Sequence, residues 1–362
     1  MEKLRVELGE NSYDILFKSD FEELAASVKS VSKTNKLLVV ADSNVAKLYA
    51  DEVVEKFTAG GFDTSLHIFE AGEENKNMDA ILGICKACID NGLDRKSMIA
   101  ALGGGVVGDM AGFAASIYMR GIDFVQIPTT LLSQSDSSVG GKTGVDFAQS
   151  KNILGAFHQP KLVYMNVNTL KTLPEREFIS GMGEVIKHGI IRNSSFFDYI
   201  EKNADSIRKL ETDVLLGMAK ENCSVKADVV SNDEKENGLR AILNFGHTIG
   251  HAVESSFDFQ LTHGACVGLG MCAASYISVK RGLIGADKLE RIENVLTAYG
   301  FDIKVDIKSN DVVYEYMQHD KKKSAGKLKF VLPTDIGEVI QVTDVTKEEI
   351  YEALDYIGGN IN

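Results

Sequence analysis

The sequence is poor in the residues that would indicate a disulfide-stapled or linker-rich chain. It contains only five cysteines and four prolines among 362 residues. An odd number of cysteines in a chain of this length does not indicate a disulfide framework, so a reducing, cytoplasmic setting is favoured. So few prolines leave no room for a proline-rich linker. The length instead predicts roughly two domains with an ordinary buried core.

Basic residues are also in short supply. Lysine and arginine number 39 against 52 aspartates and glutamates, which gives a formal net charge of −13. A nucleic-acid binder needs a basic face for the phosphates, so this class is disfavoured. Residues 1–17 lack the apolar run of a signal peptide. Residues 259–279 carry no Asp, Glu, Lys or Arg, but their glycines and polar side chains predict a buried core helix after a loop rather than a membrane span.

The two halves of the chain differ in texture. The first half alternates short β-branched runs with helix-length segments, which predicts a mostly parallel sheet covered by helices on both faces. Strands are expected at residues 36–41, 65–69, 97–102, 123–127 and 161–166, and helices at 45–58, 78–91 and 108–119. After Leu173 the strand-like runs nearly vanish, and helices are expected at 175–192, 195–209, 214–230, 242–255, 264–281 and 288–299. We therefore predict an α/β N-terminal domain over residues 1–173 and an all-α C-terminal domain over residues 174–362.

A glycine-rich turn follows one of the predicted strands and opens a predicted helix. Residues 103–108 read GGGVVG and match the GxGxxG pattern. Glycines let the backbone approach a phosphate closely, and a helix N-terminus supplies free N–H groups and the positive end of a dipole. The pattern alone is weak, because a tight strand-to-helix turn without a ligand can have the same glycines. A dinucleotide or phosphate ligand is the favoured interpretation.

Several possible metal ligands compete in the helical half. His247 and His251 have i, i+4 spacing, Glu184 and His188 share it, and His263 stands just before a predicted helix. A catalytic zinc site favours three nitrogen or oxygen ligands and one open position. Spacing alone nominates His247 with His251, although such a pair is more often structural. Three histidines and Glu184 within one predicted domain strengthen the metal interpretation.

Cationic residues cluster where an acidic protein has no evident need of them. These are Lys142, Lys151, Lys187, Lys226, Arg240 and the lysines at 321–323. For Lys322 and Lys323 a solvated surface is the better interpretation. Lys142 and Arg240 lie in uncharged surroundings, which favours binding of a phosphate or carboxylate. A second motif, Cys85-x-x-Cys88, lies inside a helical pattern, where a redox role is disfavoured.

Seven segments in order resemble the 3-dehydroquinate synthase family. The resemblance covers roughly residues 42–333 and rests on GGGVVGDMAGFAASIYMRGI, QIPTTLLSQSDSSVGGKTGVD, KNILGAFHQP, GMGEVIKHG, DEKENGLRAILNFGHTIGHAVE, LTHGACVGLGM and HDKK. It implies a Rossmann-like NAD-binding domain followed by a helical domain that binds metal and substrate. It also implies NAD, one divalent metal ion (zinc or cobalt) and a small-molecule substrate.

The resemblance implies a lyase reaction, the conversion of 3-deoxy-D-arabino-heptulosonate 7-phosphate to 3-dehydroquinate and phosphate. In the family, NAD transiently oxidises the carbon-5 hydroxyl, which acidifies the neighbouring proton. Phosphate is then eliminated, the ketone is reduced, the ring opens and an intramolecular aldol step closes the carbocycle. A divalent metal would polarise the hydroxyl, and a cationic pocket would hold the phosphate.

The resemblance also implies roles for individual residues. Glu184, His247 and His263 match the family's metal ligands, so His251 would either support the ligands from behind or contact the substrate, and His188 is no longer a candidate ligand. The substrate set comprises Lys142, Asn152, Lys187, Lys226, Arg240, Asn244 and Lys321, with Asp136 and Glu236 as carboxylates of the same pocket. The NAD set comprises Asp42, Asn44, Glu73, Lys76, Gly104, Gly105, Val106, Asp109, Thr129, Thr130, Lys142, Lys151 and Thr169. Arg120 matches an arginine that family members lend across a dimer interface, which implies a homodimer.

Three alternatives remain at this point. Another cyclase of the same superfamily would act on a related sugar phosphate, although Arg240 suits a substrate carboxylate that those substrates lack. A metal-dependent polyol dehydrogenase on a related fold would release NADH. A non-catalytic NAD- or metal-binding module would be expected to have lost a ligand or a cation, and none is missing from the motifs.

Overall fold

The computed structural model describes residues 3–148, 150–234, 238–257, 260–323 and 328–359, and the side chains of 319–323 are outside this description. The chain divides into two compact units, Met1–Leu173 with Leu215–Glu234, and Pro174–Val214 with Lys235–Asn362. The first division coincides with the boundary drawn from the sequence. The segment Leu215–Glu234 groups with the first unit, whereas the sequence placed it in the second domain.

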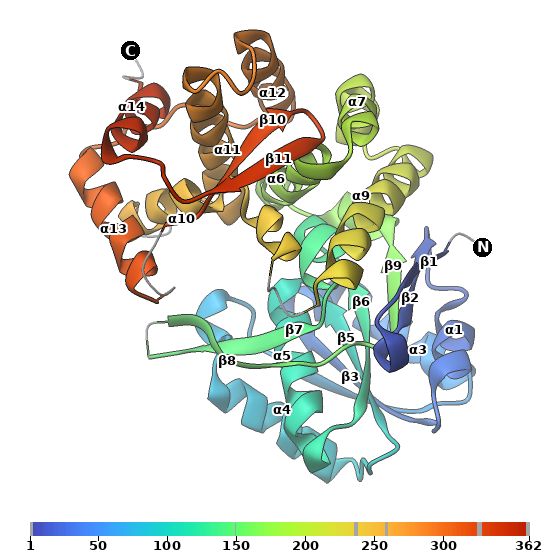
Figure 1. The fold of residues 1–362 in the computed structure, drawn as a ribbon. Helices are drawn as coiled ribbons and strands as arrows, with labels where there is room; N and C mark the ends of the chain where they lie inside the picture. Colours follow the sequence, from blue (N-terminus) through green and yellow to red (C-terminus); the bar gives the residue numbers. More distant parts are fainter. Residues whose placement is uncertain (1–2, 149, 235–237, 258–259, 324–327, 360–362) are drawn as a thin grey trace. The chain divides into compact units, whose positions relative to one another are not determined.

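The first unit is built on a seven-stranded sheet with the order β1-β2-β9-β6-β5-β3-β4 (Figure 1). All neighbouring strands are parallel except β1 and β2, which are antiparallel. The strands are β1 Lys3–Val6, β2 Tyr13–Lys18, β3 Lys36–Asp42, β4 Asp63–Phe69, β5 Met98–Gly103, β6 Asp123–Pro128 and β9 Leu162–Asn166.

The central strands are apolar along their length because both faces of the sheet are covered. In β3, Leu38 and Val40 join the core formed with α4 (Met78–Asp90) and α5 (Gly105–Ile117). The alternate residues Leu37 and Val39 join a second core on the opposite face. That second core includes side chains of α1 Leu24–Val31 and α3 Asp51–Ala59.

A separate antiparallel hairpin, β7 (Lys142–Phe147) and β8 (Ser150–Phe157), packs against α5 (Figure 1). Val145 is fully buried in the core beside α5, whereas Phe147, Ile153 and Phe157 are more than half exposed. Helix α9, Thr212–Asn232, supplies the segment that joins this unit late in the chain. The short elements are η1 Gly9–Asn11, α2 Ser43–Val45, η2 Ala46–Ala50, η3 Glu73–Asn75, η4 Tyr118–Arg120, η5 Ser133–Ser137 and η6 Val167–Thr172.

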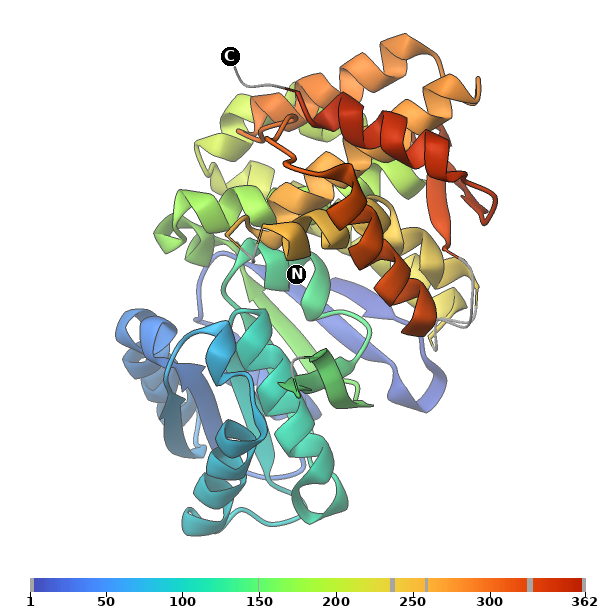
Figure 2. The ribbon, with the colours of Figure 1, turned by 90° about the vertical axis from the view of Figure 1, so that its left-hand side faces the viewer.

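The second unit is mostly helical. Helices α10 and α11 lie side by side within it (Figures 1 and 2). Its elements are α6 Glu175–Arg192, α7 Ser194–Lys202, α8 Ala204–Arg208, η7 Leu239–Asn244, α10 His247–Ser256, α11 His263–Lys280, α12 Ala286–Ala298, α13 Asn310–Lys323, β10 Phe330–Asp335, β11 Glu338–Val342 and α14 Lys347–Ile357.

The structure confirms the predicted fold class and adds elements to it. The helical unit also contains the β10–β11 hairpin, which an all-α domain does not include. The predicted helix at 242–255 begins only at His247, because residues 239–244 form a 3-10 turn. The apolar stretch at 259–279 largely coincides with α11, most of whose side chains are buried. In the described part of the chain, no helix combines the length and apolar character that a membrane crossing requires.

Candidate active site

The strand order places a topological switch point at the carboxyl ends of β3 and β5. From β3 the chain passes to β4 on one side and then returns to β5 on the other side, so the direction of winding reverses between β3 and β5. Open α/β sheets bind ligands outside the carboxyl ends of the strands at such a switch point. Asp42 ends β3 and Gly103 ends β5, so the topology brings two parts of the predicted NAD set to this edge. Asp42 also accepts hydrogen bonds from the backbone N–H groups of Asn44 and Val45.

The glycine turn at the end of β5 leaves little space for side chains. Helix α5 begins at Gly105, three residues before the predicted start. A Cβ on Gly104 would lie 3.0 Å from Thr130 Cγ2, and one on Gly105 would lie 3.2 Å from Ser137 Oγ. Thr129 follows β6 in the same region, and its buried hydroxyl has no hydrogen-bond partner among the described residues. The turn therefore combines a helix N-terminus with an unsatisfied polar atom, which suits a phosphate-containing ligand.

Lys76 links the glycine-turn helix to the β7–β8 hairpin. Its ammonium group lies 2.6 Å from Asp109 Oδ2 and 2.6 Å from Asn152 Oδ1, and the residue is only 5% exposed. Burial raises the pKa of Asp109 to about 6, against the opposing effect of Lys76. Burial also lowers the pKa of Lys76, but Asp109 outweighs it, so this pKa is raised. Through the hydrogen bonds of Lys76, Lys76 and Asp109 of the predicted NAD set are thus joined to Asn152 of the predicted substrate set.

A second ion pair in the first unit joins Lys226 to Asp136. Lys226 lies on α9, and its Nζ is 2.5 Å from Asp136 Oδ1 and 2.5 Å from the Asp136 carbonyl. The neighbouring Asn222 donates to the Ser135 carbonyl at 2.8 Å, so α9 fixes this turn at two points. The late segment Leu215–Glu234 therefore brings Lys226 to η5, which the sequence division at residue 173 did not anticipate.

In the second unit, four predicted ligand or substrate residues converge. Glu184 Oε1 lies 3.4 Å from His247 Nε2 and 3.6 Å from His263 Nε2. The rings of His247, His251 and His263 have centroids between 5.1 and 5.6 Å apart, and one nitrogen from each lies within 4.8 Å of the others. The structure thus brings together both the spacing-based pair and the set implied by the family resemblance. His188, from the competing pair, is completely buried.

Glu184, the buried carboxylate at the centre of this cluster, has its pKa shifted by the groups around it. Glu184 is 1% exposed, and one of its oxygens contacts the ammonium group of Lys187. Burial raises the pKa of Glu184, but Lys187 and His247 outweigh it and hold the pKa well below its usual range. Burial lowers the pKa of His263, whereas Glu184 and Glu254 raise it to about 9. Glu184 is therefore an anionic carboxylate that lies among imidazoles and attracts positively charged groups.

Glycines bring the backbones of α6, α10 and α11 into direct contact around the cluster. Three residues of the cluster have a glycine as a neighbour in the sequence: Gly183 precedes Glu184, Gly246 precedes His247 and Gly264 follows His263. A Cβ on Gly264 would lie 1.9 Å from the Ser180 carbonyl oxygen, and one on Gly183 would lie 3.0 Å from the Gly264 oxygen. Gly246 has φ +78°, and a Cβ there would lie 2.7 Å from the Val267 oxygen. Residues without side chains are needed at these contacts.

The remaining predicted residues differ in their surroundings. Arg240 is buried, whereas Asn244, Lys142, Lys151 and Arg120 are exposed. Thr169 is buried and bonded within its own region: its hydroxyl donates to Asn166 O at 2.8 Å and accepts from Gln134 at 3.1 Å. Glu236 lies outside the described residues, and Lys321 lies on α13 with its side chain outside the description.

All five cysteines are free, and burial raises the pKa of Cys88 to about 12, which opposes a redox role for the CxxC pair.

The sequence reasoning missed Glu254. Its Oε2 lies 3.4 Å from His263 Nδ1, and its side chain is 10% exposed. The signal was present in the spacing, because Glu254 follows His247 by seven residues and His251 by three, which places all three on one face of a helix.

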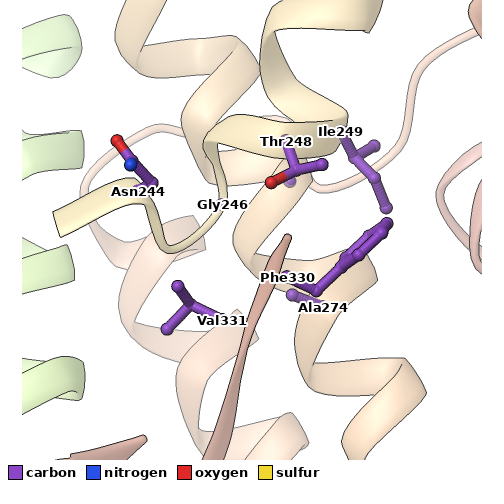
Figure 3. Close-up of a pocket in the computed structure, with 8 residues that line it drawn as sticks. Asn244, Gly246, Thr248, Ile249, Ala274, Phe330 and Val331 are labelled. Atoms are coloured by element: carbon purple, nitrogen blue, oxygen red, sulfur yellow. The ribbon is translucent and has the colours of Figure 1, made fainter. Parts of the chain in front are cut away.

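A small hollow lies between α10, α11 and β10 (Figure 3). Ile249 from α10 points toward Phe330 of β10 in this view. Of the predicted site residues that the structure describes, only Asn244 lines the hollow, and none of the residues that line it is titratable. The hydroxyl of Thr248 donates to the Lys329 carbonyl at 2.9 Å, so the β10 side braces the first turn of α10.

Comparison with known proteins identifies relatives along nearly the whole chain. A family model described as 3-dehydroquinate synthase N-terminal matches residues 66–180, and one described as 3-dehydroquinate synthase C-terminal matches residues 181–323. A 3-dehydroquinate synthase of Acetivibrio thermocellus is 51% identical over 95% of this chain and 96% of its own length. One from Ruminiclostridium cellulolyticum is 49% identical over 96% of this chain and 97% of its own length.

Solved structures with the same fold include related cyclases. A 2-epi-5-epi-valiolone synthase from Streptomyces hygroscopicus, with NAD+ and Zn2+ bound, is 28% identical with a TM-score of 0.89, covering 97% of this chain and 98% of that one. A 2-deoxy-scyllo-inosose synthase complexed with carbaglucose-6-phosphate, NAD+ and Co2+ is 26% identical with a TM-score of 0.84, covering 98% of this chain and 100% of that one.

Proposed function

The chain belongs to the 3-dehydroquinate synthase family, and from this premise we propose how its residues carry out the family's reaction. The reaction converts 3-deoxy-D-arabino-heptulosonate 7-phosphate to 3-dehydroquinate and phosphate. It makes the enzyme a carbon–oxygen lyase that uses NAD and one divalent metal ion, zinc or cobalt. The observation that carries the proposal is the convergence of Glu184, His247, His251 and His263 in one unit.

Glu184, His247 and His263 would hold the metal ion. Their donor atoms are one carboxylate oxygen and two imidazole nitrogens, a set that suits zinc and leaves a position open for substrate. Glu184 Oε1 is buried without a hydrogen-bond partner among the described residues and faces both imidazoles, which supports this assignment. When bound, the metal ion would supply Lewis acidity at a substrate hydroxyl, and NAD would supply reversible oxidation.

The position of several members of the NAD set at the switch point of the sheet supports their assignment. Gly104, Gly105 and Val106 would place backbone N–H groups of α5 beside the pyrophosphate, and the unsatisfied hydroxyl of Thr129 points to a ligand in the same region. Thr169 is supported less, because its hydroxyl already has two partners. The other members proposed are Asp42, Asn44, Glu73, Lys76, Asp109, Thr130, Lys142 and Lys151.

Cations would hold the two anionic ends of the substrate. We assign this role to Lys142, Lys187, Lys226, Arg240 and Lys321, and we propose Asn152, Asn244, His251, Asp136 and Glu236 as further residues that contact the substrate. The Lys226–Asp136 contact fixes the position of the ammonium group. The departing phosphate would take up the substrate proton itself, so the proposal requires no separate protein base.

We further propose a homodimer in which Arg120 reaches the neighbouring active site. Arg120 is exposed, and both it and Met119 have positive φ, at 71° and 48°. Tyr118 anchors this turn, because it is buried and its hydroxyl donates to the Leu93 carbonyl at 2.9 Å. A backbone held in the left-handed region by an anchored turn is a feature that clusters at functional sites.

The function is tested in one reaction mixture. Purified protein receives the heptulosonate phosphate, catalytic NAD and zinc, while phosphate, dehydroquinate and NADH are measured together. We expect phosphate and dehydroquinate to rise one-for-one without accumulation of NADH, and chelation to stop both. Accumulation of NADH without phosphate would instead indicate a dehydrogenase. Turnover only of other sugar phosphates would indicate a different cyclase.

The ligand assignment is tested by a contrast between two histidines. We expect His247→Ala to abolish both activity and stoichiometric metal binding, because it removes a ligand. His251→Ala should retain the metal, measured by elemental analysis of the purified protein, while losing activity through substrate contacts. Loss of the metal from the His251 variant would restore the pair nominated by helical spacing.

A further inference from the structure

Glu254 lies on the same face of α10 as two histidines of the cluster. The positions 247, 251 and 254 are separated by four and three residues, so their side chains follow one another along the helix. Glu254 lies at the end of this row, where its Oε2 is 3.4 Å from Nδ1 of His263 on α11. The side chain is only 10% exposed, although a carboxylate normally prefers water.

The ring of His263 is therefore held between two carboxylates. Nδ1 faces Glu254, and Nε2 faces Glu184 at 3.6 Å. In the neutral ring only one nitrogen carries a proton, and the bond made by that nitrogen fixes which one remains available as a ligand. With a metal ion bound, a proton on Nδ1 donated to Glu254 would leave the Nε2 lone pair available to the metal on the side of the ring that faces Glu184.

His247 has the same arrangement with a different acceptor. Its Nδ1 lies 3.0 Å from the backbone carbonyl of Phe245, and its Nε2 lies 3.4 Å from Glu184. The main chain thus fixes the ring of His247. For His263 the acceptor is a side chain, whose removal by substitution leaves the backbone intact.

We propose that Glu254 is a positioning residue that orients His263 and raises the basicity of its Nε2 for the divalent metal ion. The inference rests on the proposed function, since that function supplies the metal. In this proposal Glu254 acts through the imidazole of His263, with which its Oε2 is in contact. Partners of this kind commonly change metal affinity by about 10–100-fold.

The test compares three substitutions in the full-length protein. Glu254→Ala removes the acceptor, Glu254→Gln keeps an acceptor oxygen without the charge, and Glu254→Asp keeps the charge on a shorter side chain. Affinities for Zn2+ and Co2+ are measured by competition with a chromophoric chelator, and the visible absorption of the Co2+ form reports the geometry of the ligands.

We expect Glu254→Ala to weaken metal binding by about 10–100-fold and to change the Co2+ spectrum. Glu254→Gln should fall between the wild type and Glu254→Ala and should retain a near-native spectrum, because orientation persists while basicity falls. Glu349→Gln is the matched control: this carboxylate is also paired, with Arg281 in the same unit, but lies at the start of α14. It should lower stability and leave metal affinity unchanged.

A purely structural role for Glu254 predicts a different result. Glu254→Ala would then lower the free energy of unfolding of the metal-free protein while metal affinity and the Co2+ spectrum stay at wild-type values, which would overturn the inference. If Glu254→Ala does not fold, Glu254→Gln and Glu254→Asp decide by the same criteria. Failure of the wild type to bind either metal would overturn the proposed metal centre itself and this inference with it.

Discussion

At the scale of single residues, Lys76 combines burial with two short polar contacts. Its partner Asp109 is also largely enclosed, with a side chain that is 18% exposed. Desolvation disfavours the Asp109 charge, and the adjacent ammonium group offsets that cost. The electrostatic balance at the start of α5 therefore depends on one lysine from another element.

We expect Lys76→Met to lower the free energy of unfolding by about 2 kcal/mol near neutral pH, less than for a fully enclosed pair. The folded-state pKa of Asp109, already raised to about 6, should rise further without the lysine. A raised carboxyl pKa means that the folded state binds more protons than the unfolded state, so the loss should shrink as the pH falls from the variant's higher Asp109 pKa toward about 6 and should stay constant at lower pH. Urea denaturation of both proteins across pH measures this difference.

The control compares Asp109→Asn with Asp109→Asn combined with Lys76→Met. Neither protein of this pair has the Asp109 carboxylate, so the pH dependence of the stability difference between them should disappear. A penalty that is constant between about pH 5 and pH 8 would show that Asp109 is not the titrating group.

The residue scale also shows what spacing can reveal about the site. The helical period identified His247 with His251, and Glu184 was visible as a candidate beside them. No local pattern selects which atoms meet, because the cluster forms only when α6, α10 and α11 come together. Glu254 was missed although it continues the same helical face, since a lone glutamate on a helix is usually solvated.

At the scale of elements, the C-terminus of α11 is joined to the N-terminus of α14 by Arg281. Its guanidinium donates to both oxygens of Glu349, at 2.6 and 2.8 Å, and to Asp344 at 2.9 Å. Glu349 is also part of the capping box with Thr346 that begins α14. One arginine therefore serves both the packing of the two helices and the start of the second.

We expect Arg281→Met to destabilise the protein by about 1 kcal/mol at neutral pH, because the fork of hydrogen bonds is partly exposed. Arg281 lowers the pKa of Glu349 in the folded state. A lowered carboxyl pKa stabilises the fold above the unfolded-state pKa, and this contribution is lost as the pH falls through the folded-state value. The difference between wild type and variant, measured by denaturation, should therefore shrink below about pH 4.

Arg95→Met, which replaces an exposed arginine on a different element, provides the comparison for loss of a surface charge. It should leave the stability nearly unchanged. An Arg281 variant whose deficit stays constant down to acidic pH would mean that Glu349 draws its stabilisation from the capping box alone.

The central strands that are buried on both faces were predicted from the sequence, and so was the more exposed edge strand β4. The runs in β3, β5 and β9 are largely apolar, and the interior of β6 is interrupted only by Gln126, so composition identifies them. Strands β1 and β2 were missed, and the charges on β1 at the antiparallel edge obscure its pattern. The hairpin β7–β8 was also missed, because its exposed Phe147 and Phe157 break the alternation that a half-buried strand shows.

At the scale of the whole molecule, the proposed dimer predicts complementation between two inactive variants. Arg120→Ala would remove the residue donated to the neighbouring site, and Lys226→Met would disable a protomer's own site. In a mixed dimer, the Arg120→Ala protomer keeps its own Lys226 and receives Arg120 from its partner. Random pairing should then restore about a quarter of the wild-type activity when the two are co-expressed.

Each variant expressed alone should be inactive, and sedimentation should give the mass of a dimer for both. Co-expressed variants that remain inactive while forming dimers would mean that Arg120 acts within its own protomer. A monomeric wild type with full activity would contradict the dimer itself.

The direct backbone contacts at Gly183, Gly246 and Gly264 have a consequence for how this chain can change over generations. They set the spacing of Glu184, His247 and His263, the proposed metal ligands, through the main chain, so mutations of neighbouring side chains would leave that spacing unchanged. The three glycines themselves have no such freedom, because even one added methyl group would push two helices apart. Over generations, substitutions can therefore vary the side chains around the proposed metal site while the spacing of its proposed ligands is retained.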